Sequence, residues 1–315
     1  LVGSGAGETV LDGENLHRLI YVDNDGGYFS ITGFTIQNGY FPDYWGENGS
    51  SGGIMVWKSD LYIANNHFLN NKAYAGGGLY VYSGSTGIIE RNLFIGNDNI
   101  QQDVHEVHSR AVRLQLSGNN GDEVLKFYNN TIWTESEWDY HGTGWRSLRV
   151  TGYSPQVRII NNIVATSGNS PGATIYAQGH PVIMYNLTES NIDGGFDTFG
   201  NPNYQQNPTF VDPDNGDFTL VANSLAIDGG DPDLDEDGVT WENDIDDQDS
   251  DGTRLDVGYG HDREPNIADI RQYELGSTVT VMGIINSNNQ SGGSYTGLSM
   301  QDNSAGIAIY INPDI

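Results

Sequence analysis

The chain has 315 residues, no cysteine and a formal net charge of −29 at pH 7. The lack of cysteine excludes disulfide bonds, thiolate catalysis and cysteine-ligated zinc. The charge argues against nucleic-acid partners, because neutralising phosphates requires a basic face. No apolar run reaches about 18 residues, so we expect no direct membrane insertion.

The first predicted elements are short strands that repeat along residues 1–200. Six segments alternate apolar and polar residues around a turn: SITGFTI (30–36), YIANNHF (62–68), IIERNLF (88–94), KFYNNTI (126–132), RIINNIV (158–164) and VIMYNLT (182–188). Their alignment places asparagine at one position in five copies: Asn66, Asn92, Asn130, Asn162 and Asn186, with Phe34 in the first copy. A β-sandwich with chance turns would not keep asparagine in this register.

A second strand precedes each of these segments. The six strands are LIYVD (19–23), GIMVW (53–57), GLYVY (78–82), AVRLQ (111–115), SLRVT (147–151) and TIYAQ (174–178). Both alignments give units of roughly 25–35 residues, which are typical of the coils of a β-solenoid. The sequence therefore predicts an all-β solenoid of about six or more coils, stacked about 4.8 Å apart, with a ladder of asparagine amides inside one turn.

Alternate residues of the second set of strands face outward in this prediction. The outward positions include candidate ligand-binding residues: Tyr21, Trp57, Tyr80, Tyr82, Arg113, Arg149 and Tyr176. Aromatic rings stack on sugars and arginine pairs with carboxylate or sulfate, so this face is a candidate acidic-polysaccharide site. The alternative is a local ion-pair network among strand-favouring aromatic residues.

Catalysis is the next alternative for this face. A polysaccharide lyase would use arginine, lysine or histidine as its base, and the same region contains His105, His108, Lys126 and His141. An inverting glycosidase would need clustered outward carboxylates, and the predicted outward positions offer only Asp23. We therefore assign no catalytic residue.

The acidic charge is concentrated after the repeats. Residues 191–315 contain 3 Lys and Arg against 24 Asp and Glu, and 13 acidic residues lie between Asp228 and Asp256. Two Asp-x-Asp-x-Asp-Gly runs supply the candidate metal ligands: Asp233, Asp235, Asp237, Asp247, Asp249 and Asp251, with Asp244 at the twelfth position of the first run. Alternate carboxylates around a glycine turn suit Ca²⁺. The alternative is a solvated acidic linker.

In the second run, the twelfth position is Gly258 rather than a carboxylate, although Asp256 is close in sequence. This departure from the EF-hand pattern, and the lack of predicted flanking helices, favour loops of the thrombospondin or dockerin kind. Calcium bound there would be structural, because it would order a segment that its own charge otherwise extends.

The pattern of residue types changes again from Ile267 onward. The segments IADIRQYELGSTVTVMGIINSN (267–288) and YTGLSMQDNSAGIAIYI (295–311) predict three alternating strands. They resemble the opening of an OB-fold module, which so few residues cannot close into a barrel.

Several segments resemble the right-handed parallel β-helix repeat family of bacterial secreted and surface proteins. These are GSGAGETVLDG (3–13), ITGFTIQNG (31–39), GGGLYVYSGSTGIIERNLFIGN (76–97), NPTFVDPDNGDFTLVANSLAIDGGDP (207–232) and DGTRLDVGYG (251–260). The resemblance implies a parallel β-helix over 1–200, a closing coil with a calcium-binding segment over 201–265 and a partial OB-like module over 266–315.

The resemblance also implies an extracellular or cell-surface location. It is specific to fold, since this fold serves adhesins, structural rods and polysaccharide-cleaving enzymes. Our main hypothesis is a non-catalytic structural or adhesive module, stabilised by calcium and able to associate end to end into fibres. The alternative is a domain that binds or cleaves an acidic polysaccharide.

Overall fold

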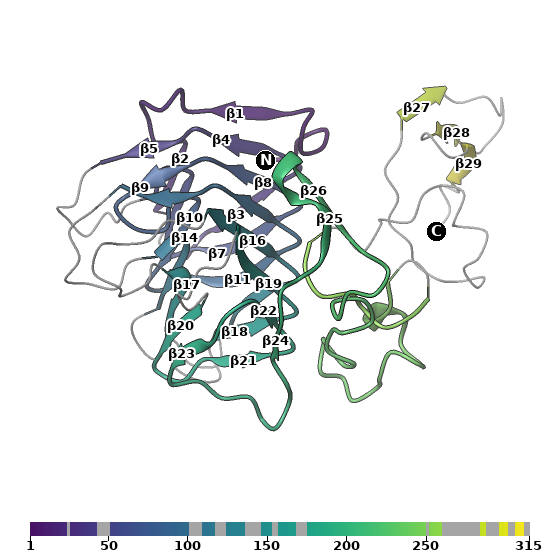
Figure 1. Ribbon diagram of the computed structural model, residues 1–315. Coiled ribbons are helices and arrows are strands. Elements are labelled where there is room, and N and C mark those ends of the chain that lie inside the picture. The colour runs from purple at the N-terminus through teal and green to yellow at the C-terminus, as the bar shows by residue number, and fades with distance from the viewer. Residues whose placement is uncertain are drawn as a thin grey trace.

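The chain folds into an all-β protein (Figure 1). The computed structural model describes residues 1–23, 26–42, 51–100, 109–116, 124–135, 146–152, 157–167, 175–249 and 252–259, and three strands beyond them. The only helical elements in these ranges are two single-turn 3₁₀ helices, Pro213–Asn215 and Ile245–Asp247. No helix among these residues has the length and apolarity needed to cross a bilayer.

Three long parallel sheets form the body of the molecule. The first sheet joins β2 (Ile20–Asp23), β6 (Ile54–Trp57), β10 (Leu79–Tyr82), β14 (Ser109–Gln115), β17 (Arg146–Thr151), β20 (Ile175–Gln178) and β23 (Ile192–Gly194). The second sheet joins β3 (Tyr28–Thr32), β7 (Asp60–Ala64), β11 (Thr86–Glu90), β15 (Leu125–Tyr128), β18 (Val157–Ile160) and β21 (Val182–Met184).

The third sheet joins β1 (Val10–Asp12), β4 (Thr35–Gln37), β8 (His67–Leu69), β12 (Leu93–Ile95), β16 (Thr131–Glu135), β19 (Ile163–Ser167), β22 (Leu187–Thr188) and β24 (Tyr204–Gln205). Three two-residue strands, β5 (Tyr40–Phe41), β9 (Lys72–Ala73) and β13 (Asp98–Asn99), form a smaller parallel sheet. The chain visits the first, second and third sheets in turn before returning to the first, and we call each such pass a circuit.

Successive circuits stack like residues on like. Leu79 lies opposite Ile54 on one side and Val112 on the other, and all three side chains are fully buried. In the third sheet, Phe68 and Phe94 stack with their ring centroids 4.5 Å apart. Burying each such side chain contributes about 1.5–3 kcal/mol, so the alternating pattern of the strands determines which face becomes the core.

The predicted asparagine ladder is confirmed by its hydrogen bonds. Asn66, Asn92, Asn130 and Asn162 each donate through backbone N–H and side-chain Nδ2 to the Oδ1 of the next rung, at 2.9–3.1 Å. The last predicted rung, Asn186, donates in the same way to an unpredicted rung, Asn203. The remaining Nδ2 hydrogens satisfy backbone carbonyls at the bend between the second and third sheets.

A left-handed residue precedes each rung from Asn66 to Asn186, and also Phe34 at the same position of the first copy, and creates this bend. The residues are Gly33, Asn65, Arg91, Asn129, Asn161 and Tyr185, with φ between 51° and 74°. Asparagine and glycine adopt this conformation most easily, which explains the Asn-Asn pairs of the sequence. Arg91 and Tyr185 show that the stacked neighbours impose the bend even on other residues.

The outward face of the second sheet changes character along the stack. One outward column runs through Thr32, Ala64 and Glu90 in the early circuits, and then through Tyr128, Ile160 and Met184 in the later ones. The last three are buried, so the later circuits require a cover outside the sheets. Residues 207–259, which we call the closing segment, supply it.

The closing segment also covers the later circuits of the third sheet. Its strands β25 (Phe210–Asp212) and β26 (Asp217–Leu220) pair antiparallel, and Figure 1 shows them in green beside that sheet. The rings of Phe210 and Phe218 each meet the ring of Trp133 edge to face, with centroids 5.8 Å apart, in one apolar cluster with Ile163 and Leu187.

The described part of residues 266–315 consists of β27 (Ile284–Ser287), β28 (Thr296–Gln301) and β29 (Gly306–Ile311), which form one antiparallel sheet. Three strands were expected here, and the OB-like assignment stays a prediction.

Candidate metal centre

The acidic part of the closing segment docks on the bend between the second and third sheets. The backbone N–H of Asp231 donates to Asn161 Oδ1 at 2.7 Å, and Gly258 N–H donates to the Asn161 carbonyl at 2.8 Å. Asn129 Nδ2 donates to the carbonyl of Asp256 at 3.2 Å. The left-handed residues of the bend therefore hold both ends of the acidic stretch.

One apolar side chain anchors the middle of this stretch. Leu234 packs against the cluster that contains Tyr128, Ile160 and Met184 on the outward face of the second sheet. Two arginines flank it: Arg158 pairs with Glu236, and Arg254 lies over the ring of Tyr185 and donates to the carbonyl of Gly230.

Three carboxylates come together beside the backbone of Leu234. One oxygen from each of Asp233, Asp235 and Asp247 lies within 4.8 Å of the others, and we call these residues the inner trio. Asp247 is fully buried, and its Oδ1 accepts the N–H of Leu234 at 2.7 Å. Its Oδ2 is also buried and has no hydrogen-bond partner, and the same is true of Asp233 Oδ1. These two oxygens are open to a cation.

A second set of carboxylates shares one member with the first. Asp235, Asp237 and Asp244 also offer oxygens within 4.8 Å of one another, and we call them the outer trio. Each holds its orientation by accepting the backbone N–H two residues later: Asp237 to Asp235 at 3.1 Å, Val239 to Asp237 at 2.7 Å and Asp246 to Asp244 at 3.0 Å.

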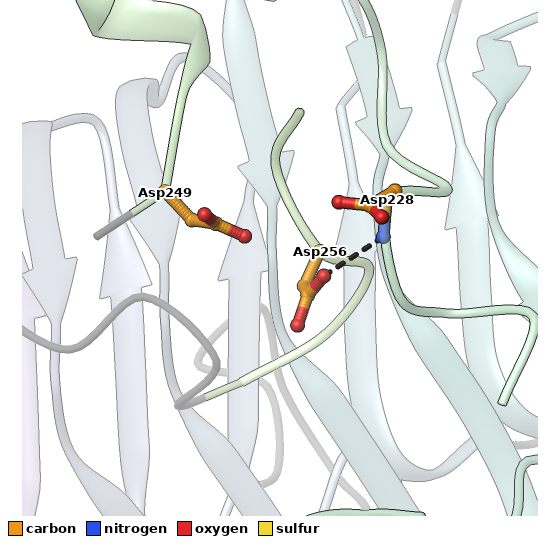
Figure 2. Close-up of side chains that lie close together, drawn as sticks. All are labelled: Asp228, Asp249 and Asp256. Carbon is orange, nitrogen blue, oxygen red and sulfur yellow. Dashed lines mark hydrogen bonds between the residues drawn. The ribbon is translucent and has the colours of Figure 1, made fainter. Parts of the chain in front are cut away.

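A third group, shown in Figure 2, consists of Asp228, Asp249 and Asp256. Here Asp256 Oδ1 accepts the N–H of Asp228 at 2.9 Å, and Asp228 Oδ1 accepts the hydroxyl of Thr253. These contacts tie the start of the acidic stretch to its end.

The inner trio lies in an unfavourable electrostatic environment. Burial, together with the carboxylates of Asp235, Asp244 and Asp233, raises the pKa of Asp247 to about 6, against the opposing hydrogen bond from Leu234 N–H. Burial likewise raises the pKa of Asp231 to about 6, although the N–H of Asp233 and the charge of Arg254 oppose this. Without a counter-ion, ionisation of these side chains opposes docking of the segment.

The structure brings together five of the seven predicted metal ligands: Asp233, Asp235, Asp237, Asp244 and Asp247. It groups them differently from the two predicted loops, because Asp247 of the second run joins the first. Asp249 instead meets Asp228 and Asp256, which were not predicted as ligands, and Asp251 lies outside the described residues. The glycine at the twelfth position of the second run was the sequence signal that this run does not close on itself.

The predicted aromatic and arginine positions lie in register on the first sheet. Tyr80 pairs with Arg113, Arg113 with Arg149 and Arg149 with Tyr176 on neighbouring strands. Their exposure varies: Tyr21 is exposed, Tyr80 is buried, and the other five candidates, Trp57, Tyr82, Arg113, Arg149 and Tyr176, are half-buried.

Contacts within the face account for part of this burial. The guanidinium of Arg113 lies 5.2 Å from the ring centroid of Tyr80, whose hydroxyl donates to Gln115 at 2.7 Å. Arg149 lies 5.6 Å from the ring of Tyr176, and Trp57 contacts Tyr82 edge to face. The rings therefore pair with each other and with the arginines. Of the residues considered for catalysis, His105, His108 and His141 lie outside the described part of the chain.

These features define an all-β protein with several parallel sheets and a carboxylate cluster on one flank. No protein-family model, curated protein or solved structure matches the chain. Functional inference therefore depends on the geometry of the carboxylates.

Proposed function

We propose that the chain is a right-handed parallel β-helix that serves as a non-catalytic structural or adhesive module at the cell surface. In this proposal, calcium binds the inner trio and holds the closing segment against the later circuits. The register of three parallel sheets and the continuous amide ladder support the helical rod.

The buried side chain of Asp247 is the observation that carries the proposal. A buried carboxylate oxygen without a partner is costly, and two further carboxylates within 4.8 Å add repulsion. A hard cation removes both penalties at once. Ca²⁺ accepts carboxylate oxygens at about 2.3–2.6 Å in variable geometry, whereas Mg²⁺ requires a near-ideal octahedron and retains water. Calcium therefore fits an irregular loop better.

The same chemistry supports the proposed location. Calcium sites in extracellular modules work at about 10⁻⁴–10⁻³ M, so a segment of this kind stays occupied outside the cell. End-to-end association is part of the proposal, because among the described strands β1 and β24 each pair on one side only in the third sheet. Light scattering of the calcium-loaded and chelated chain measures association, and a monomer in both states would contradict this part.

The principal experiment is a calcium titration of the chelator-treated chain, followed by thermal unfolding and hydrogen exchange. Calcium is expected to raise Tm and to protect the amides of residues 228–247, with the asparagine ladder protected in both states. Magnesium at equal concentration serves as the control. Identical Tm and exchange with chelator and with millimolar calcium would refute the proposal.

An acidic-polysaccharide site on the first sheet is the second candidate. It is favoured by Arg113 and Arg149, two cations in register on neighbouring strands that an anionic chain would stabilise. Retention on alginate, pectate or glycosaminoglycan columns tests binding, with Arg113→Gln as the variant. Ultraviolet absorbance of an unsaturated product tests lyase activity. If the chain shows no retention and forms no product, this candidate is excluded.

A further inference from the structure

We infer that the inner and outer trios together bind two divalent cations, with the carboxylate of Asp235 bridging them. This inference rests on the proposed function and extends it from a single ion to a dinuclear centre. It also differs from the sequence-based expectation, in which each aspartate run would enclose its own ion.

The spacing of the oxygens fits one ion in each trio. Calcium–oxygen distances of about 2.3–2.6 Å put ligands on opposite sides of an ion about 4.6–5.2 Å apart. The oxygens of each trio all lie within 4.8 Å of one another, so each trio can surround one ion. Asp235 belongs to both, whereas Asp233 and Asp247 belong only to the inner trio, and Asp237 and Asp244 only to the outer one.

The inner and outer ion positions differ in how deeply their ligands are buried. Asp247 is fully buried and has one buried oxygen without a hydrogen-bond partner, as does Asp233 with its Oδ1, and each residue offers an oxygen to the inner trio. An ion at the inner position would satisfy both oxygens. The outer carboxylates are more accessible: Asp235 and Asp237 are exposed and Asp244 is half-buried. We therefore expect the inner ion to bind tightly and the outer ion to exchange faster.

The charge balance favours the second ion. Five carboxylates within one cluster carry a charge of about −5 when ionised, and one divalent ion leaves about −3. Two ions reduce this to about −1. The described arginines of the region are engaged elsewhere, since Arg158 pairs with Glu236 and Arg254 with Gly230 and Tyr185.

The test counts calcium ions by isothermal titration of the chelator-treated full chain and of five variants. Asp247→Asn should remove the inner ion, Asp244→Asn the outer ion, and Asp235→Asn should weaken both at least tenfold. The matched control is Asp246→Asn, which is exposed, lies between the two ligands Asp244 and Asp247 in sequence and belongs to neither trio. It should bind as the parent chain does.

The dinuclear centre is supported if Asp244→Asn and Asp247→Asn each lose one calcium ion and the two lost ions are different. If Asp244→Asn titrates like the parent chain, or removes the same single ion as Asp247→Asn, the inference fails while the proposed calcium function survives. If the parent chain binds no calcium, the proposed function fails as well. Circular dichroism of each variant checks that the β structure is intact, and Asp244→Glu, which keeps the carboxylate, should retain the outer ion if the fold is preserved.

Discussion

The asparagine ladder and the carboxylate cluster are neighbours in the molecule, and each contains buried polar side chains that need hydrogen-bonding or ionic partners. In the ladder, neutral amides satisfy the polar groups of a bend, and every rung from Asn66 to Asn186 both donates and accepts. In the cluster, aspartates lie in the loops of the closing segment, and buried oxygens of Asp233 and Asp247 have no partner.

The difference shows which region depends on its surroundings. An amide supplies both donors and acceptors, so a stack of amides completes itself with the chain alone. A carboxylate supplies only acceptors, so a cluster of carboxylates requires donors or cations from elsewhere. We therefore expect the stability of the ladder to be independent of calcium and that of the closing segment to follow the calcium concentration. The predictions below test this contrast.

The largest effect is expected from Asn130→Ala in the middle of the ladder. The Nδ2 of Asn130 serves the carbonyls of Ile89 and Tyr128 and the next rung, and its Oδ1 accepts from Asn92. Leaving these four buried groups unsatisfied, at about 1–3 kcal/mol for each group, should cost at least about 4 kcal/mol in the free energy of unfolding. Urea unfolding with and without calcium measures this cost.

The matched control for Asn130→Ala is Asn203→Ala, at the half-buried last rung, where the loss should be smaller. Equal losses at both positions would contradict cooperative stacking. A loss at Asn130 that disappears in chelator would contradict the independence of the ladder from calcium.

The next prediction is that Asp247→Asn changes the free energy of unfolding in opposite directions with calcium and in chelator. With calcium at about 100 times its Kd, Asp247→Asn should lower the free energy of unfolding by about 2–3 kcal/mol, because the ion is lost. In chelator the same substitution should stabilise the chain, because a neutral amide replaces a buried, repelled carboxylate. Thermal unfolding of the variant, with Asp246→Asn as control, measures both signs. Destabilisation in both conditions would point to a packing role instead.

Much of the body could be predicted from sequence because its signals are local and repeated. The alternation of residues such as Ile54 and Val56 predicts the core face, and the repeated asparagines predict the ladder in correct register. The sixth rung, Asn203, was missed because the strand after it is only two residues long and lacks the apolar pattern.

The site could be predicted only in part. Residue types and spacing identified Asp233, Asp235, Asp237 and Asp244 as ligands that gather in the structure. Spacing could not reveal that Asp247 turns inward to join them, because that depends on docking of Leu234 against the second sheet. The change from Glu90 to Tyr128 in the outward column was a visible signal that the later circuits are covered.

A smaller effect is expected from Leu234→Ala. Leu234 is half-buried against Tyr128, Ile160 and Met184, so truncation should cost about 1–2 kcal/mol, less than a fully buried leucine. Because Leu234 N–H also orients Asp247, the variant should bind calcium more weakly, although no ligand is changed. Isothermal titration tests this link, with the exposed Leu225→Ala as control. Unchanged calcium affinity would show that docking and binding are separate.

The smallest effect is expected from His67, which lies where the closing segment meets the third sheet. Its Nε2 lies 2.7 Å from the hydroxyl of Tyr259, and burial lowers its pKa below the usual 6.5. Below about pH 6.5 the unfolded chain therefore binds a proton that the folded chain refuses, so His67 lowers stability as pH falls. Asp231 acts in the opposite sense, because its raised pKa makes the folded chain bind a proton first. The informative quantity is thus the difference between the parent chain and His67→Gln, measured by urea unfolding from pH 7.5 to 5.5 with calcium saturating. The parent should lose more stability than the variant over this range, and parallel curves would show that His67 has the same pKa in the folded and the unfolded chain.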